Sequence, residues 1–157
     1  HEITAKIIKV VLAAYKQCIH GLSESELEAK WEKVRDVRYV VTGALEVERR
    51  EKRIGSSLEA APVVYINDPE LVAAVEDTDF AEVCITSGIV IEQGEGPADA
   101  FRLDDVANVA VVPAEASGRK CARSWRLTDD VGSDPDYPDV SARDAAALRE
   151  LGIKPAA

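Results

Sequence analysis

The clearest hydrophobic pattern is a helical stripe in the N-terminal third of the chain. Ser23 is followed three residues later by Glu26, a capping-box signature, and the helical spacing starts there. Apolar residues then recur at steps of three, four and seven residues, at Leu27, Trp31, Val34, Val37, Val41, Ala44 and Leu45. Because Gly55 can adopt the left-handed conformation that closes a helix, we expect a helix of about thirty residues ending at Ile54–Gly55.

Shorter elements with a mixed composition follow this helix. Four segments rich in β-branched and aromatic residues are predicted strands: 62–66, 80–86, 89–92 and 106–113. Between the first two, Asp68-Pro69-Glu70 predicts a helix start, with a capping aspartate, proline at the first helical position and an acid in the first turn. We therefore expect an α+β fold, in which a small mixed sheet carries one helix.

From Gly118 onward, turns dominate the sequence. A short helix is predicted over 142–151, with Gly152 at its end. This appendage is too small to hold much of a core, and we expect Trp125 to be its buried hydrophobic anchor. The sequence thus predicts three parts, the ranges 1–60, 61–116 and 117–157.

Composition narrows the class of protein. At 157 residues the chain can bury one core, and no apolar run reaches the roughly 18 residues of a membrane span, so no membrane partner is expected. Three cysteines, at 18, 84 and 121, form no disulfide framework, which is typical of a cytoplasmic protein. The chain has no methionine, so we expect it to be a piece of a longer protein.

The net charge of −10 argues against nucleic acid, but the charge is distributed unevenly. Residues 66–116 hold twelve acidic residues and one basic residue, Arg102. Residues 22–53 hold eight of each sign, and residues 119–126 hold four basic residues and no acid. A polyanion would be repelled by the middle of the chain and tolerated at both flanks.

Two pairs of positions near the C-terminus have the spacing of a four-ligand zinc site. Cys121-x2-Ser124 and Ser141-x2-Asp144 are separated by 16 residues, as in a pair of metal-binding knuckles. One thiol, two hydroxyls and a carboxylate suit zinc poorly, so we predict no metal and no cofactor. Ser141 and Asp144 also form a capping box for the last helix. The alternative is that Cys121, Asp144 and a borrowed ligand still hold zinc.

Two groups of basic residues are candidate RNA contacts. The first lies on one helix face at the edge of the apolar stripe: Arg35, Arg38, Arg49 and Arg53. These arginines either contact phosphates or form a solvated face with intrahelical ion pairs. The second group surrounds an aromatic residue: Arg119, Lys120, Arg123, Trp125 and Arg126. Unpaired bases stack on such aromatic side chains, whereas the alternative is that Trp125 is buried.

Two blocks of sequence resemble a known family. The first runs from Trp31 to Arg38 and continues at Arg53-Ile54-Gly55-Ser56-Ser57-Leu58-Glu59-Ala60, and the second is the knuckle segment 120–144. Together they are similar to the C-terminal part of bacterial isoleucyl-tRNA synthetase, from the last helix of its anticodon-binding domain to its zinc-finger module. The resemblance covers the chain from about Leu22 onward, whereas residues 1–20 and three of the four metal positions depart from the family pattern.

The resemblance implies a function for the region. The whole enzyme would join isoleucine to its tRNA using ATP, and this region would bind and orient tRNA(Ile), with the remainder of the synthetase chain as its other partner and no role for DNA. The family's His-x-Gly-His and Lys-Met-Ser-Lys-Ser loops are absent, so no catalytic residue is expected here. The alternative is a structural or protein-interaction domain that packs against the synthetase body with little direct RNA contact.

Overall fold

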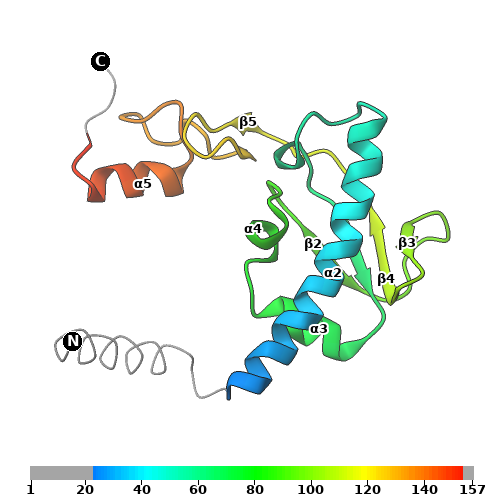
Figure 1. Ribbon diagram of the computed structural model, residues 1–157. Coiled ribbons are helices and arrows are strands. Elements are labelled where there is room, and N and C mark those ends of the chain that lie inside the picture. The colour runs from blue at the N-terminus through cyan, green and yellow to red at the C-terminus, as the bar shows by residue number, and fades with distance from the viewer. Residues whose placement is uncertain (1–22, 154–157) are drawn as a thin grey trace, which may run out of the picture. The chain divides into compact units, whose positions relative to one another are not determined.

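The computed structural model describes residues 23–153, drawn in colour in Figure 1. The departure of residues 1–20 from the family pattern therefore lies outside the described residues. The chain falls into two compact units, one ending at Glu32 and the other beginning at Lys33.

Helix α2 spans Glu24–Arg50 and begins where the capping box predicts. The backbone N–H of Ser23 donates to the Glu26 carboxylate (2.8 Å), and the N–H of Glu26 donates to the Ser23 hydroxyl (3.3 Å). Burial along the helix starts at Val34 and continues through Val37, Val40, Val41, Ala44 and Leu45. Trp31 is exposed, so the buried stripe is shorter than the apolar spacing predicts.

The helix ends four residues earlier than predicted, and Gly55 does not end it. Lys52 adopts the left-handed conformation (φ 60°) that we expected of Gly55. The N–H of Lys52 donates to the carbonyl of Arg49 (3.1 Å), and the N–H of Arg53 donates to that of Glu48 (3.0 Å). This pair of bonds is a Schellman motif with a lysine where glycine is usual. The prediction was wrong because it placed the left-handed residue at the nearest glycine.

The four-stranded sheet is mixed, as the sequence predicts, and the α+β class is confirmed. It contains β1 (Val63–Ile66), β2 (Val90–Gln93), β3 (Phe101–Leu103) and β4 (Val106–Val112), in the order β2-β1-β4-β3. Strand β1 is parallel to β2 and antiparallel to β4, and β3 is antiparallel to β4. The sequence pattern missed β3 because only three residues form it, next to a loop.

Helix α2 packs on this sheet, in front of its central strands in Figure 1. Val64 and Ile66 of β1 are buried in the same core as the stripe of α2. A Cβ atom on Gly43 would lie 3.0 Å from the Phe101 ring of β3, so the helix approaches the sheet as closely as a glycine allows. The segment of α2 from Lys33 onward is thus held by the sheet.

Two short helices, α3 and α4, complete this body, where one was predicted. Helix α3 (Pro69–Glu76) starts as expected, with the Asp68 carboxylate accepting from the N–H of Glu70. The predicted strand over 80–86 is wrong, because Phe80–Cys84 forms helix α4. Asp79 caps α4 by accepting from the N–H of Glu82, and Ile85 ends it in the left-handed conformation (φ 58°). A β-rich composition was overridden by this local cap.

The C-terminal module, residues 117–153, has a separate small core. Its elements are the hairpin of β5 (Arg119–Lys120) and β6 (Leu127–Thr128), followed by α5 (Ala142–Glu150). Five buried residues form the core: Cys121, Val131, Tyr137, Val140 and Ala145. The prediction that Trp125 anchors this module is wrong, because its side chain is 61% exposed. The turn after Cys121 closes with Trp125 in the left-handed conformation (φ 64°), outside the core.

None of the helices within residues 23–153 is long and apolar enough to cross a membrane.

The Schellman motif predicts the effect of one substitution. We expect Lys52→Gly to raise the free energy of unfolding by about 0.5–1 kcal/mol, because glycine occupies the left-handed region without a Cβ penalty. Urea unfolding of both proteins measures this difference. Lys52→Ala removes the same charge without relieving the backbone, so a gain of equal size in that control would contradict the explanation.

Candidate nucleic-acid interface

The helical arginines differ in how far their charges are available. Arg35 is exposed and makes no hydrogen bond or ion pair with any residue in 23–153. Arg38 is partly buried, and its Nε donates to the carbonyl of Val83 at the end of α4 (2.8 Å). The guanidinium of Arg38 therefore ties α2 to α4, whereas that of Arg35 is free to meet a phosphate.

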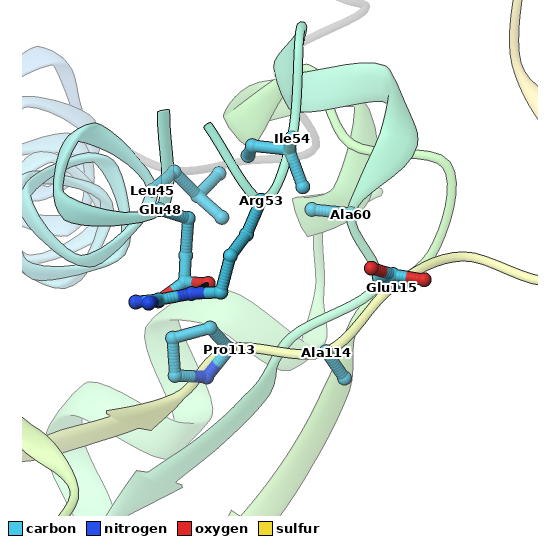
Figure 2. Close-up of a pocket in the computed structure, with 8 residues that line it drawn as sticks. All are labelled: Leu45, Glu48, Arg53, Ile54, Ala60, Pro113, Ala114 and Glu115. Atoms are coloured by element: carbon cyan, nitrogen blue, oxygen red, sulfur yellow. Dashed lines mark hydrogen bonds and ion pairs between the residues drawn. The ribbon is translucent and has the colours of Figure 1, made fainter. Parts of the chain in front are cut away.

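The other two members of this group are paired with acidic residues. Arg49 forms an ion pair with Glu46 one helical turn earlier. Arg53 lies beyond the end of α2 and turns back to Glu48, with Nε 2.5 Å from the carboxylate, while also pairing with Glu51. Figure 2 shows Arg53 and Glu48 on the wall of a cavity of about 380 Å³ between the end of α2 and the segment after β4. These pairs match the ion-pair alternative for Arg49 and Arg53.

The second basic group contains an aromatic platform. Lys120 on β5 places its Nζ 5.0 Å from the centre of the Trp125 ring, within cation–π range. The Trp125 indole is exposed, and its backbone is fixed by an N–H···O bond to Cys121 (2.9 Å). The arrangement holds a large flat side chain in solvent beside a positive charge, which is a geometry that suits an unpaired base.

The three arginines around this platform have structural partners. Arg119 donates to the carbonyl of Val131 within the module (3.4 Å). Arg123 forms an ion pair with the buried carboxylate of Asp144 (2.7 Å). Arg126 donates to the carbonyl of Ser87, outside the module (3.0 Å). Arg119 and Arg123 are nevertheless exposed, so their charges still contribute to the potential around Trp125.

The four positions of the zinc-like frame meet in the module's core. The Cys121 thiol donates to Asp144 Oδ2 (3.0 Å), and Cys121 Sγ accepts the N–H of Ser141 (3.4 Å). The Ser141 hydroxyl donates to Asp144 Oδ2 (3.1 Å) and accepts the N–H of Asp144 (3.3 Å). The Ser141 N-cap of α5 is therefore confirmed, and it belongs to the same cluster as Cys121. The reciprocal half of the predicted capping box is not formed, because the N–H of Ser141 donates to Cys121 and not to the Asp144 carboxylate.

This cluster does not fit zinc. Burial alone would raise the pKa of Asp144, but hydrogen bonds from Cys121, Ser124, Arg123 and Ser141 outweigh it and lower that pKa to about 2. The Arg123 guanidinium neutralises the carboxylate that a metal would need. Within residues 23–153, no three His, Cys, Asp or Glu side chains are grouped to hold an ion. The donor set forms a hydrogen-bonded network in place of a coordination shell.

Two residues outside the predicted set also touch the basic group. Ser87 and Glu82, in the connection after α4 and in α4 itself, contact Arg126 across about forty positions of sequence. No local spacing signals such a contact, and the strand predicted over 80–86 placed Glu82 in the wrong setting. The network around Trp125 is therefore larger than the sequence indicates.

The Asp144 network predicts a pH-dependent loss of stability. Asp144→Asn leaves the donors of Cys121 and Ser141 without their carboxylate acceptor, so we expect the module to lose about 1–3 kcal/mol at pH 7. The folded-state pKa of about 2 lies below the ordinary 3.8, so this contribution is complete above about pH 4 and is lost as pH falls toward 2. The difference between the two proteins should shrink over that interval.

Trp125 fluorescence during urea unfolding, in a Trp31→Phe background, reports on the module alone. The matched control is Asp139→Asn, an exposed aspartate whose side chain has no partner in the described chain. An Asp144→Asn protein as stable as this control at pH 7 would show that the network contributes nothing.

Comparison with known proteins identifies the family. No protein-family model matches the chain. The chain is 67% identical over 142 residues to an isoleucine–tRNA ligase of Agrobacterium fabrum, covering 90% of the chain and 15% of that protein. It is 65% identical over 127 residues to the ligase of Bartonella henselae, covering 81% and 13%, and 56% identical over 147 residues to that of Bradyrhizobium diazoefficiens, covering 92% and 15%.

The chain thus spans about one seventh of the length of these relatives. Identity of this size extends over most of the chain. The chain belongs to the bacterial isoleucine–tRNA ligase family and corresponds to one segment of those longer proteins.

Proposed function

We propose that this segment binds and orients tRNA(Ile) for the ATP-dependent attachment of isoleucine, which the rest of the synthetase chain carries out. The segment supplies binding and positioning, and no catalytic residue. The relatives are named as isoleucine–tRNA ligases, which supports a tRNA and the remaining synthetase chain as partners. We expect the full protein to act in the cytoplasm, where protein synthesis supplies its substrates.

The pairing of Lys120 with the exposed Trp125 is the observation that carries this proposal. A tryptophan with 61% of its surface in water loses the benefit of burial, so its exposure favours a binding role. Stacking of a base on such a ring contributes about 1–3 kcal/mol, and the neighbouring ammonium adds attraction to phosphate. Arg35 is the second candidate, as an uncommitted phosphate contact on α2.

The remaining candidates have a weaker claim as direct contacts. Arg38, Arg123 and Arg126 hold parts of the fold together through hydrogen bonds to buried or backbone acceptors. Arg49 and Arg53 are neutralised by glutamates of their own segment. Arg119 is exposed beside the platform. These six arginines remain candidates for RNA contact, and Trp125, Lys120 and Arg35 are the strongest candidates.

A second function, in protein packing, is favoured by the charge distribution. The net charge is −10, and most of the candidate arginines are already paired inside the segment. A structural domain that packs against the synthetase body would need no free cations. The two functions differ in salt dependence, because phosphate contacts release counterions and apolar packing does not.

We further propose that the segment holds no zinc. The support is the network at Cys121, in which Arg123 and Ser141 occupy the acceptor atoms of Asp144. Elemental analysis of the purified chain should find zinc far below one atom per molecule. A stoichiometric metal that dissociates on Cys121→Ser would overturn this proposal.

The RNA function predicts a graded response to substitution. We expect Trp125→Ala to weaken tRNA(Ile) binding by roughly five- to hundred-fold, through loss of one stacked base. We expect Arg35→Ala and Lys120→Ala each to lower the slope of log K against log salt by about one, through loss of one phosphate contact. Fluorescence anisotropy of labelled tRNA, titrated at salt concentrations from about 50 to about 300 mM, measures both the affinity and its salt dependence.

Trp31→Ala is the matched control, because Trp31 is the chain's other tryptophan, is also exposed, and lies in the N-terminal part of α2. Its affinity should equal that of the unmodified chain. Binding that is absent or insensitive to salt in the unmodified chain would favour the packing function. Equal losses from Trp125→Ala and Trp31→Ala would reject the platform.

A further inference from the structure

The C-terminal module is joined to the sheet body, residues 33–116, by polar contacts. The two hydrophobic cores share no residue among those described, so neither core continues into the other. The chain leaves the body at Ala116, whose N–H donates to the carbonyl of Glu59 (2.8 Å). Beyond that point, the orientation of the module depends on contacts that Ser87 and Glu82 make with it.

Ser87 ties three segments together through one hydroxyl. Its Oγ donates to the carbonyl of Leu58, in the 3-10 turn η1 (Ser57–Glu59), at 2.5 Å, and accepts the N–H of Leu127 in β6 at 2.7 Å. The Ser87 residue is buried, and its own N–H donates to the carbonyl of Ala60 (3.1 Å). The hydroxyl therefore sits on a fixed backbone and places β6 at a defined distance from the body.

Glu82 receives two arginines from different parts of the module. Arg126, which directly precedes β6, lies 3.7 Å from the carboxylate and also donates to the carbonyl of Ser87. Arg143, in the first turn of α5, pairs with the same carboxylate oxygen. The exit at Ala116, the Ser87–Leu127 bond and the Arg143–Glu82 pair give three points of attachment, which is the number needed to fix one rigid body on another.

These attachment points adjoin the platform. Trp125 immediately precedes Arg126, and Lys120 is the cross-strand partner of Leu127 in the β5–β6 hairpin. The residues that would meet RNA and the residues that contact the body are thus neighbours on the same short ribbon. A rotation of the module about its exit would swing the Trp125 ring with it.

We infer that Ser87 and Glu82 are positioning residues for RNA binding, which act by fixing the direction in which the Lys120–Trp125 platform faces. This inference rests on the proposed RNA function. We call the contacts of Ser87 and Glu82 with the C-terminal module the joint. When the joint is intact, the platform and the surface of α2 present one arrangement to a tRNA. When it is loosened, only a fraction of molecules has that arrangement, and the apparent dissociation constant rises by the inverse of that fraction.

Two substitutions separate this role from direct contact. Ser87→Ala removes a buried, uncharged hydroxyl that no RNA could reach. Glu82→Gln removes a negative charge, and by simple electrostatics it should strengthen the binding of a polyanion. The joint predicts the opposite sign. We expect both variants of the 157-residue chain to bind tRNA(Ile) roughly three- to ten-fold more weakly than the unmodified chain, for a locked fraction reduced to about a third or a tenth.

Glu76→Gln is the matched control, because Glu76 is an exposed glutamate of the same body without a partner among residues 23–153. Its affinity should be unchanged or slightly higher. Tighter binding by Glu82→Gln, equal to that of the control, would overturn the inference. So would a Ser87→Ala variant whose affinity is unaltered.

Residual dipolar couplings of backbone amides test the joint without any RNA. One alignment tensor should fit both α5 and strands β1–β4 in the unmodified chain, whereas Ser87→Ala and Glu82→Gln should need two tensors with the couplings inside each part preserved. A single tensor in both variants would overturn the inference, as would two in the unmodified chain. If the unmodified chain fails to bind tRNA, the proposed function fails, and the tensors alone decide on the joint.

Discussion

The carboxylate of Asp144 is the group on which the C-terminal module depends. Only five buried side chains form the module's core among the described residues, four of them small or medium-sized, and this is too little apolar surface to specify a fold unaided. Asp144 accepts hydrogen bonds from the knuckle at Cys121, from the helix cap at Ser141 and from Arg123, so it joins the two halves of the frame. A zinc ion would draw four ligands together by coordination, whereas here one anion collects hydrogen-bond donors from positions with a similar spacing. The network is directional, and it requires the charge of Asp144 to persist at neutral pH.

The need for such polar contacts also determines which basic residues remain available to bind a partner. Arg123 belongs to the Asp144 network, Arg126 contacts the body and Arg38 ties two helices, so much of the positive charge predicted to meet RNA stabilises the fold. A protein with an excess of acids can still carry a local binding surface if a few cations remain uncommitted where the acids are sparse. Lys120 satisfies that condition, because residues 119–126 contain no acid. Net charge is therefore a poor guide to the partner of this segment.

The sequence predicted the parts of the structure that local chemistry decides. The capping box at Ser23, the N-cap at Ser141, the Pro69 helix start and the central strands β1 and β4 all follow from short-range signals, and all are present. The misses arose where two local signals conflicted or where contacts were distant. At 80–84 a cap at Asp79 outweighed a strand-like composition, and Lys52 took a conformation that Gly55 was expected to supply. Trp125 was expected to be buried because tryptophan usually is, yet a left-handed turn places it in solvent. Contacts such as Ser87 with Leu127 depend on tertiary packing and leave no sequence pattern.

The cation above Trp125 limits what the indole can hold. The Lys120 ammonium lies over one face of the ring, 5.0 Å from its centre, so a flat ligand would have to stack on the opposite face. An aromatic with both faces open could slip between two neighbouring nucleotides and keep their stack continuous. A ring screened on one side can take a single flat partner and must end the stack there. If the segment binds RNA as proposed, such a ring would favour a nucleotide already turned out of its helix, and the folded shape of the RNA, more than its base sequence, would decide which strand is accepted.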